Sequence, residues 1–561
     1  MTTGGGSRTR RPPDILFAAA LLLSVLPPVA ALTSPRSPPW SGGAIDHGSL
    51  RLYFSARDEG VGIADDASSV PLVFIPGMKG SHLAVAADGA DGDDANGSRR
   101  LGRKRRRGGT RVWLTFPNLI NFPSGRDACA DRDLTLPLTY DGRGRQHRGP
   151  LVPDGVVRNV IDLALPGRGG GGGGPAAPPA FGLFPFYGHV LERLRRESGR
   201  RPTASFAYDW RRSVDDLSEE FEAFCDETFP GQPVQVLAHS MGGLIAFAAM
   251  RRRPEKFAPG GVFAGVPFGT GTQYLQDLHR GYYTELDRCR QFLPAAQMSF
   301  SSHACFFPVD AEEAADLLVD VTAREKGGGV DFVADTSAIG KSTTEFRPTV
   351  EGDAVDMDYY DPDEWERLEM GVFDPTLDLD AETREAYKNH LRLSMEKGRR
   401  FRATALRPYG GEAETLPPLT VCATDKFATV NQILRRKKEP LPITIKTSNS
   451  KKARNAVTRV LSKIPRGKKI SPDGSKPAGR TRHEKNSWEY DYVSGRSVPG
   501  DGRIDYAKAF PPAGVPFREV ALDSAHAKQF CWEDGEGGSL GKIWAELEEQ
   551  IDGYARRRSG M

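Results

Sequence analysis

The stretch that decides the fold is "VQVLAHSMGGLIAFAAM", Val234–Met250. Its first residues form a short β-branched run behind Gly231 and Pro233, which predicts a buried strand. From Gly243 onward the apolar residues are dense and lead into a run of arginines, which is typical of a buried helix with a cationic last turn. Ser240 therefore lies on a strand-to-helix turn.

Small residues stand on both sides of this serine, because Ala238 precedes it and Gly242 follows it at the same spacing. A small-x-Ser-x-Gly turn is a nucleophile elbow, in which the tight turn lifts the hydroxyl above the sheet. The backbone N–H of Met241 then points toward a carbonyl under attack. The alternative is an ordinary helix-capping serine, since serine is a favoured N-cap residue. An elbow requires an acid, a base and a second N–H donor elsewhere in the chain.

Composition narrows the class of protein. The chain has 561 residues, of which 39% are hydrophobic and 27% charged, as in a soluble globular protein and unlike a membrane bundle. A net charge of +3 gives no reason to expect nucleic acid as a partner. The six cysteines form no CxxC pair, so we do not expect a zinc site. We expect no cofactor either.

The first residues predict a targeting segment. Arg8, Arg10 and Arg11 precede an apolar run, Ile15–Leu32, that ends in small residues. This pattern predicts a secretory signal peptide over residues 1–31, cleaved after Ala31. The protein is then expected in the secretory pathway, whether secreted or in the lumen of a lysosome, vacuole or endoplasmic reticulum. The alternative is an uncleaved signal anchor that leaves a membrane-bound protein.

Short apolar strands alternate with helical segments, which predicts an α/β fold: a mostly parallel, doubly wound sheet with helices on both faces. The rhythm lapses in one long stretch, which is interpreted as an inserted cap or lid. The predicted organisation is a linker at 32–67, a first part of the sheet domain at 68–268 with inserts at 84–110 and 166–180, a cap at 269–415, and a second part at 416–561 with a basic insert at 435–485.

A serine hydroxyl needs a base, and the base needs a carboxylate to orient it. In α/β-hydrolases these groups follow in the order Ser, acid, His, each on a loop after a strand. His526 follows a predicted strand near the C-terminus and is the preferred base. Asp501, in the turn "PGDGRI", is the preferred acid because its loop is the last one before the histidine-bearing strand. Asp425 and Asp505 remain alternatives.

The second N–H donor is expected in the loop after the first strand. The motif "IPGMKG" supplies the backbone N–H of Met78, next to Gly77, in a turn that lets a substrate approach. The alternative is a plain turn that ends a strand.

Five motifs together resemble the lecithin:cholesterol acyltransferase family, which includes lysosomal phospholipase A and phospholipid:diacylglycerol acyltransferases. They are "VFIPGMKGSHL", "AYDWR", "AHSMGG", "PGDGR" and a late "AHA". The phrases "GVFAGVPFGTG" and "PGDGRIDY" look like a less-studied branch of that family. The resemblance implies an α/β-hydrolase fold with a mobile lid and without a metal.

The resemblance also assigns roles by motif. It implies that Ser240 is the nucleophile, Asp501 the acid and His526 the base, and that Met78 and Met241 supply the oxyanion N–H groups. The supporting residues are Gly77, Gly242, Asp209 and Arg211, the last two as structural supports.

The expected function is therefore that of a lipid acyl hydrolase or O-acyltransferase acting on glycerolipid or phospholipid esters. Its partners would be the lipid, a water or alcohol acceptor, and a membrane or lipid-particle surface bound peripherally. Two rival functions are a non-lipid serine carboxylesterase, which would share the same residues, and a non-catalytic binding protein with a hydrolase fold.

Overall fold

The computed structural model describes a large part of the chain after residue 69. The described residues are 70–85, 111–113, 134–163, 181–283, 290–309, 311–315, 317–321, 344–377, 379–411, 415–437, 488–530 and 538–560. The predicted signal peptide (1–31) and linker (32–67) lie outside them, as do residues 166–180 and most of the predicted inserts at 84–110 and 435–485.

A six-stranded sheet forms the centre of the protein. In spatial order its strands are β19 (Arg518–Ala521), β14 (Leu419–Ala423), β9 (Gly261–Ala264), β8 (Gln235–His239), β1 (Leu72–Ile75) and β7 (Thr203–Ser205). Every neighbouring pair is parallel. This mostly parallel sheet confirms the predicted α/β class.

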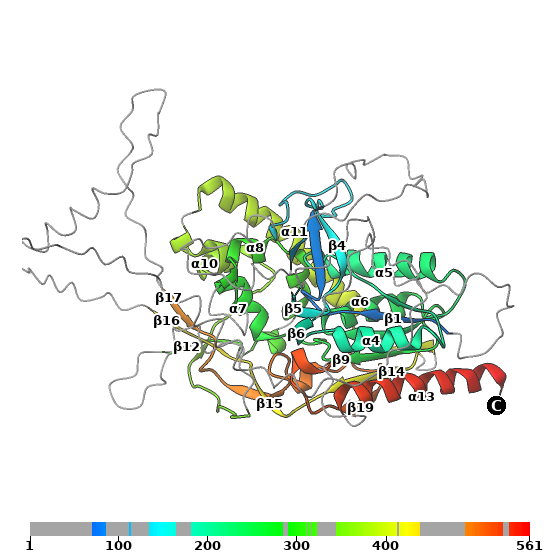
Figure 1. The fold of residues 1–561 in the computed structure, drawn as a ribbon. Helices are drawn as coiled ribbons and strands as arrows, with labels where there is room; N and C mark the ends of the chain where they lie inside the picture. The colour runs from blue at the N-terminus through cyan, green and yellow to red at the C-terminus, as the bar shows by residue number, and fades with distance from the viewer. Residues whose placement is uncertain are drawn as a thin grey trace, which may run out of the picture. The chain divides into compact units, whose positions relative to one another are not determined.

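Helices cover both faces of this sheet. They are α4 (Gly188–Glu197), α5 (Val214–Thr228), α6 (Met241–Arg252) and α13 (Ser539–Ser559). Val73 and Ile75 of β1 share a core cluster with residues of α5 and α6, whereas Leu72 and Phe74 share another with α4 and α13. Successive strand residues point to opposite faces, so one strand supplies both clusters. In Figure 1, α5 lies above the strands and α13 lies below them.

The strand order reverses direction beside β1. From β1 the chain moves outward to β7, and it then returns to add β8 on the other side of β1. Ligands of open α/β sheets bind in the crevice that such a reversal leaves at the carboxyl ends of the strands. The loop after β1 and the turn after β8, which carries Ser240, therefore lie side by side at this edge.

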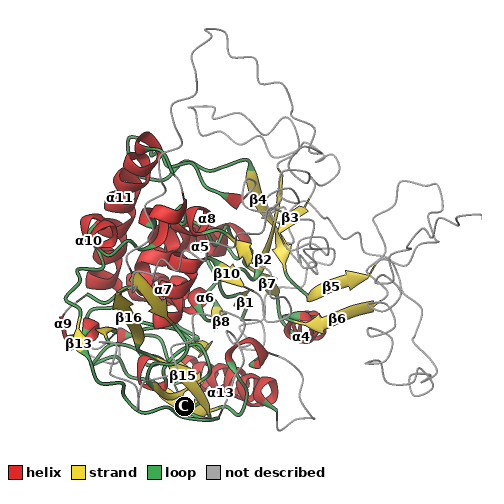
Figure 2. Cartoon of the chain, turned by 90° about the vertical axis from the view of Figure 1, so that its left-hand side faces the viewer, coloured by secondary structure: helices red, strands yellow, loops and turns green. Residues whose placement is uncertain are grey.

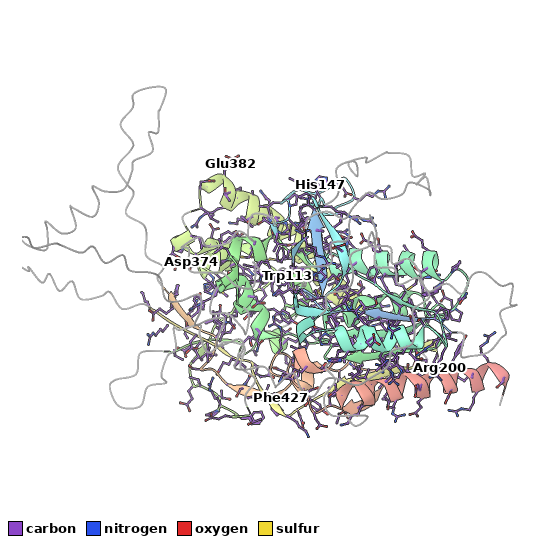
Figure 3. The ribbon with its side chains drawn as sticks, viewed as in Figure 1. Trp113, His147, Arg200, Asp374, Glu382 and Phe427 are labelled. Atoms are coloured by element: carbon purple, nitrogen blue, oxygen red, sulfur yellow. The ribbon has the colours of Figure 1, made fainter. Side chains whose placement is uncertain are left out.

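Smaller sheets flank the central one. They are β2 (Ser81–Val85) with β3 (Arg111–Trp113) and β4 (Leu151–Val156), β5 (Asn159–Leu163) with β6 (Phe181–Pro185), β10 (Tyr282–Tyr283) with β11 (Arg290–Phe292), and β15 (Phe427–Val430) with β18 (Ser497–Gly500). Trp113, labelled in Figure 3, is 3% exposed and packs its ring on Trp210 and Phe292. It thereby joins the β2–β4 sheet to the core.

The described residues of the predicted cap form several helices and a few short strands. Their helices are α7 (Thr272–Arg280), α8 (Pro294–Met298), η3 (Ser301–Phe306), α9 (Ala311–Ala314), α10 (Pro362–Arg367), η5 (Gly371–Phe373), η6 (Pro375–Leu377) and α11 (Ala381–Ala405). Helices α7, α8, α10 and α11 gather in one region of the molecule (Figure 2). Tyr359, Tyr360 and Trp365 are buried there in a separate core cluster. These aromatic side chains pack the cap, and they are not available as a lipid-docking surface.

Two strands from beyond the predicted cap join it. The sheet β13 (Asp353–Ala354), β12 (Leu318–Asp320), β16 (Ile433–Lys437) and β17 (Trp488–Asp491) combines two strands from each side of residue 416. Ile433 and Tyr490 are buried in the cap's own cluster. The domain boundaries at 268/269 and 415/416 stay predictions. In the part of the chain that the structure describes, no helix is long and apolar enough to cross a membrane.

Candidate active site

Ser240 occupies a turn that few residues other than glycine adopt. It precedes α6 with φ of 51° and ψ of −130°, and its side chain makes no hydrogen bond that caps the helix. The alternative of a helix-capping serine therefore does not describe this turn. The hydroxyl instead lies 3.1 Å from Nε2 of His526.

His526 lies between this hydroxyl and a carboxylate. Its Nδ1 is 2.7 Å from Oδ2 of Asp501. Its backbone N–H also donates to the carbonyl oxygen of Asp501 at 2.9 Å. His526 begins the short helix η9 (His526–Lys528), which follows β19, and Asp501 follows β18. Three distant segments of the chain thus bring the three predicted residues within hydrogen-bonding distance.

The carboxylate of Asp501 is itself held in place. It is 4% exposed, and its Oδ1 accepts the backbone N–H groups of Arg503 at 2.9 Å and Ile504 at 2.7 Å. Its Oδ2 accepts the side-chain amide of Gln529 at 3.2 Å. These hydrogen bonds fix the orientation of the carboxylate, with Oδ2 placed to accept the Nδ1–H of His526.

The two alternative acids lie elsewhere. Asp425 is exposed at the end of β14. Asp505 is 7% exposed, and burial raises its pKa to about 7, with a further contribution from the charge of Asp501. Of the three carboxylates considered from the sequence, Asp501 is the one in contact with the histidine.

The loop after β1 packs against the elbow by backbone shape. A Cβ at Gly77 would lie 2.8 Å from Cβ of Ser240, and one at Gly242 would lie 2.4 Å from the carbonyl oxygen of Pro76. Both positions therefore require glycine. Met78 follows Gly77, and Met241 is the first residue of α6, where a backbone N–H has no acceptor within the helix.

The "YDWR" segment forms hydrogen bonds with the backbone at both ends of that loop. The hydroxyl of Tyr208 donates to the carbonyl oxygen of Pro76 at 2.7 Å, and Trp210 Nε1 donates to that of Ser81 at 3.1 Å. Arg211 is fully buried and forms two hydrogen bonds of 2.8 Å with the carboxylate of Asp209. A buried, bidentate pair of this kind fixes the segment, and neither residue contacts the serine, aspartate or histidine described above in any hydrogen bond of the structure's described part.

A cluster of three charged side chains beside the site is not predicted from the sequence. Asp277 of α7 accepts Lys79 Nζ at 3.2 Å and Arg503 Nη2 at 3.0 Å on the same oxygen. Burial lowers the pKa of Lys79 to about 8, with Asp277 opposing that shift. The pKa of Asp277 is lowered because the two cations outweigh the effect of its burial. One cap carboxylate thus joins the loop of Met78 to the turn of Asp501.

No sequence signal marks this group, because its members are separated by roughly two hundred residues along the chain and belong to no motif in common. Tyr187, which contacts the same loop, is missed because it lies 110 residues from Gly77. His239 stands beside Ser240 in the motif "AHSMGG", but the motif does not show which groups its ring contacts. Among the described residues no cluster of three or more His, Cys, Asp and Glu side chains could hold a metal ion. Cys225, Cys305 and Cys422 are buried free thiols.

Known proteins provide an independent comparison. The family described as "Serine aminopeptidase, S33" matches residues 197–325, which contain the elbow. The lysosomal phospholipase A and acyltransferase of Canis lupus familiaris is 26% identical over 223 residues, or 38% of this chain and 50% of that protein. The chain thus spans about half the length of this curated relative.

A chain in the crystal structure of the Tle4–Tli4 complex aligns with a TM-score of 0.44 and 14% identity, over 87% of this chain and 99% of that one. The family match and the six-stranded parallel sheet identify the fold as that of the α/β-hydrolases, as predicted. At this coarse level they support a serine hydrolase. The finer resemblance to the lecithin:cholesterol acyltransferase family stays a prediction.

Proposed function

We propose that this protein is a serine-dependent acyl hydrolase or O-acyltransferase of glycerolipid or phospholipid esters. One observation carries the proposal: Ser240 Oγ, the imidazole of His526 and the carboxylate of Asp501 form a continuous path with separations of 3.1 and 2.7 Å. These are hydrogen-bonding distances for a nucleophile, a base and its orienting acid.

The first half of the reaction makes an acyl-enzyme. Asp501 accepts the Nδ1–H of His526, which leaves Nε2 free to take the proton of Ser240. The serine oxygen bonds to the ester carbonyl carbon, and the carbonyl oxygen becomes an oxyanion. The backbone N–H groups of Met78 and Met241 donate to this oxyanion. The C–O bond to the leaving alcohol then breaks, and His526 returns its proton to that alcohol.

The second half reverses the proton path. Water or an acceptor alcohol gives its proton to His526 Nε2 and bonds to the acyl carbon. The bond to Ser240 breaks, and the serine oxygen recovers the proton. Water yields a free fatty acid, and an alcohol such as a sterol or diacylglycerol yields a new ester. The choice between them depends on whether the cap excludes water from the acyl-enzyme.

The lipid class rests on similarity. The motif resemblance and the name of the canine relative both favour a phospholipid acyl donor. The description of the matched family names an aminopeptidase, which favours a substrate other than a lipid. A non-lipid serine hydrolase, such as a carboxylesterase, is therefore the second candidate. Both candidates need the same three residues, and substrate profiling separates them.

The deciding experiment measures acyl release and transfer from a labelled phospholipid, with and without an added sterol or diacylglycerol. Native protein is compared with Ser240→Ala and with Ser559→Ala, an exposed serine at the end of α13. We expect product from native protein and Ser559→Ala, and none from Ser240→Ala. Hydrolysis of short esters alone would select the carboxylesterase. Absence of both activities, together with no labelling by a fluorophosphonate, would refute the enzyme and favour a binding protein.

The place of action is part of the proposal. Residues 1–31 would direct the chain into the secretory pathway, and the mature protein would meet lipid surfaces peripherally. N-terminal sequencing of protein secreted or retained by expressing cells tests this directly. A chain that starts after Ala31 is expected, and an intact N-terminus in the membrane fraction would select the signal anchor.

A further inference from the structure

A second path of hydrogen bonds runs through Tyr187 and His239, next to Ser240. The backbone N–H of Gly77 is 2.8 Å from the hydroxyl oxygen of Tyr187. That hydroxyl is 2.6 Å from Nδ1 of His239, and Nε2 of His239 is 3.2 Å from the carbonyl oxygen of His526. The path therefore links the loop after β1 to the backbone of the proposed base.

The two end groups of this path limit which group donates each hydrogen bond. A backbone N–H only donates, so Gly77 gives its hydrogen to the oxygen of Tyr187. The Tyr187 O–H then donates to Nδ1 of His239. A carbonyl oxygen only accepts, so Nε2 of His239 carries the ring hydrogen and donates it to His526. A neutral His239 therefore carries its hydrogen on Nε2 and accepts from Tyr187 at Nδ1.

The surroundings of His239 keep it in that form. Its side chain is 3% exposed, and Tyr187 is 1% exposed. Burial, followed by the positive charge that His526 can carry, holds the pKa of His239 well below its usual value. The ring also packs against Phe530, with centroids 5.1 Å apart. Both ring nitrogens are engaged away from Ser240, so His239 is not a second base.

One end of the path is the Gly77–Met78 peptide, whose N–H is assigned to the oxyanion. The N–H of Gly77 is held by Tyr187, and its carbonyl oxygen accepts the N–H of Gly80 at 3.0 Å. That carbonyl shares a rigid peptide plane with the N–H of Met78. Anchoring Gly77 on both sides therefore fixes where the Met78 N–H points relative to Ser240.

We propose that Tyr187 and His239 are positioning residues, which hold the Gly77–Met78 peptide in register with Ser240 and with the backbone of His526. This inference rests on the proposed function, because it assigns the Met78 N–H to the oxyanion. Neither side chain touches the substrate in this role. Their effect is on the geometry of the group that does.

Three variants test it with a chromogenic short-chain ester, 4-nitrophenyl butyrate. Tyr187→Phe removes the hydroxyl that accepts from Gly77, and His239→Leu removes both ring nitrogens. His239→Gln is the rescue variant, because its amide retains one acceptor and one donor. The matched control is Tyr360→Phe, which removes a buried hydroxyl that donates to Phe307 at 3.0 Å within the cap.

We expect kcat to fall about 10-fold to 100-fold in Tyr187→Phe and His239→Leu, somewhat less than after outright loss of an oxyanion donor. KM and the apparent pKa in the pH profile of kcat/KM should not change, because binding and the base are intact. His239→Gln should recover most of kcat, and Tyr360→Phe should keep all of it. A folded Tyr187→Phe variant with kcat within twofold of native protein would overturn the inference.

A second measurement does not depend on activity. Amide hydrogen exchange in the peptide containing residues 76–80 should accelerate in Tyr187→Phe and stay at the native rate in Tyr360→Phe. Unchanged exchange would overturn the inference even if native protein hydrolyses esters. Accelerated exchange in a protein that is inert toward every ester and probe would support the structural link, while the proposed function itself would fail.

Discussion

The two sides of Ser240 are held by different means. On one side, Asp501 and His526 are fixed by hydrogen bonds that converge on a single carboxylate. On the other side, the loop after β1 meets the elbow through backbone contacts so close that Gly77 and Gly242 leave no room for a methyl group. On the first side, hydrogen bonds fix the reacting groups themselves. On the second side, close backbone packing sets the position of the loop, and the hydrogen bonds of Tyr187 and Tyr208 to its backbone support that position.

This difference separates two kinds of failure. A substitution of similar size on the hydrogen-bonded side removes a chemical group but disturbs the fold little. A substitution on the close-packed side leaves every reacting group in the chain but moves the backbone that presents them. A substitution on the hydrogen-bonded side should therefore lower activity and leave stability almost unchanged. A substitution on the close-packed side should lower both.

The largest effect is expected on the hydrogen-bonded side. His526→Gln should lower kcat/KM for an ester by about 10⁴-fold or more, since the members of such a group act as a unit. The melting temperature should stay within a few degrees of the native value, because the side chain is close to the surface, with an exposure of 13%. Ester hydrolysis and thermal unfolding measured on one preparation check both halves. A large fall in melting temperature would remove the contrast between the two sides.

Gly242→Ala tests the close-packed side. The new methyl carbon would lie 2.4 Å from the carbonyl oxygen of Pro76, so the β1 loop must shift. We expect kcat to fall about 10²-fold through displacement of the oxyanion donors, and the free energy of unfolding to fall by about 1–3 kcal/mol through overpacking.

The matched control for this variant is Gly142→Ala. A Cβ at Gly142 meets nothing within 4 Å, so both quantities should stay at their native values. Loss of activity in Gly242→Ala without any loss of stability would show that shape is not what holds this side.

Asp277 offers a way to disturb both sides together. Asp277→Asn removes the carboxylate that Lys79 and Arg503 share, at a place where the Lys79 and Asp277 side chains are each 10% exposed. Removing one partner of a buried ion pair destabilises by about 3–5 kcal/mol, and partial exposure should reduce that figure. Denaturant unfolding measures the change.

Double substitution sharpens the assignment. If Asp277 acts through Lys79, adding Lys79→Met to Asp277→Asn should restore part of the lost stability, because the repulsion between cations disappears. An additive loss in the double variant would contradict that interpretation.

A pH-dependent effect is expected from Asp505. Its folded-state pKa of about 7 lies above the usual value of an aspartate, so the folded protein binds the proton more tightly than the unfolded chain does. This contribution to stability is complete below about pH 4, and it is lost as the pH rises through 7. Relative to Asp505→Asn, native protein should lose up to about 1.4 kcal/mol per pH unit within that window. Urea unfolding at several pH values checks the slope, and parallel curves for the two proteins would refute it.

The sequence predicts those parts of the molecule that depend on local pattern. The strand and helix around Ser240 follow from apolar spacing, and the contacts of Asp501 and His526 agree with the order expected along the chain. Helix α6 begins at Met241, two residues before the apolar pattern starts, because the tight turn itself opens the helix.

Other features depend on contacts between distant segments and leave no local trace. The pairing of β16 with β12 is one, since a strand near residue 433 gives no sign that its neighbour lies near residue 318. The sharing of Asp277 by Lys79 and Arg503 is another. In both cases each residue is ordinary in its own segment, and its importance comes from the fold that brings the partner to it.

The backbone conformation of Ser240 lowers the stability of the protein at the residue that the proposed reaction needs. With φ at 51°, this residue occupies a conformation that glycine reaches without penalty and serine does not. Ser240→Gly should therefore unfold at a higher temperature than native protein, by an amount that corresponds to about 1 kcal/mol, while Ser240→Ala should not gain this benefit. The residue that the proposed reaction requires is thus less stable in this turn than the glycine that would abolish the reaction.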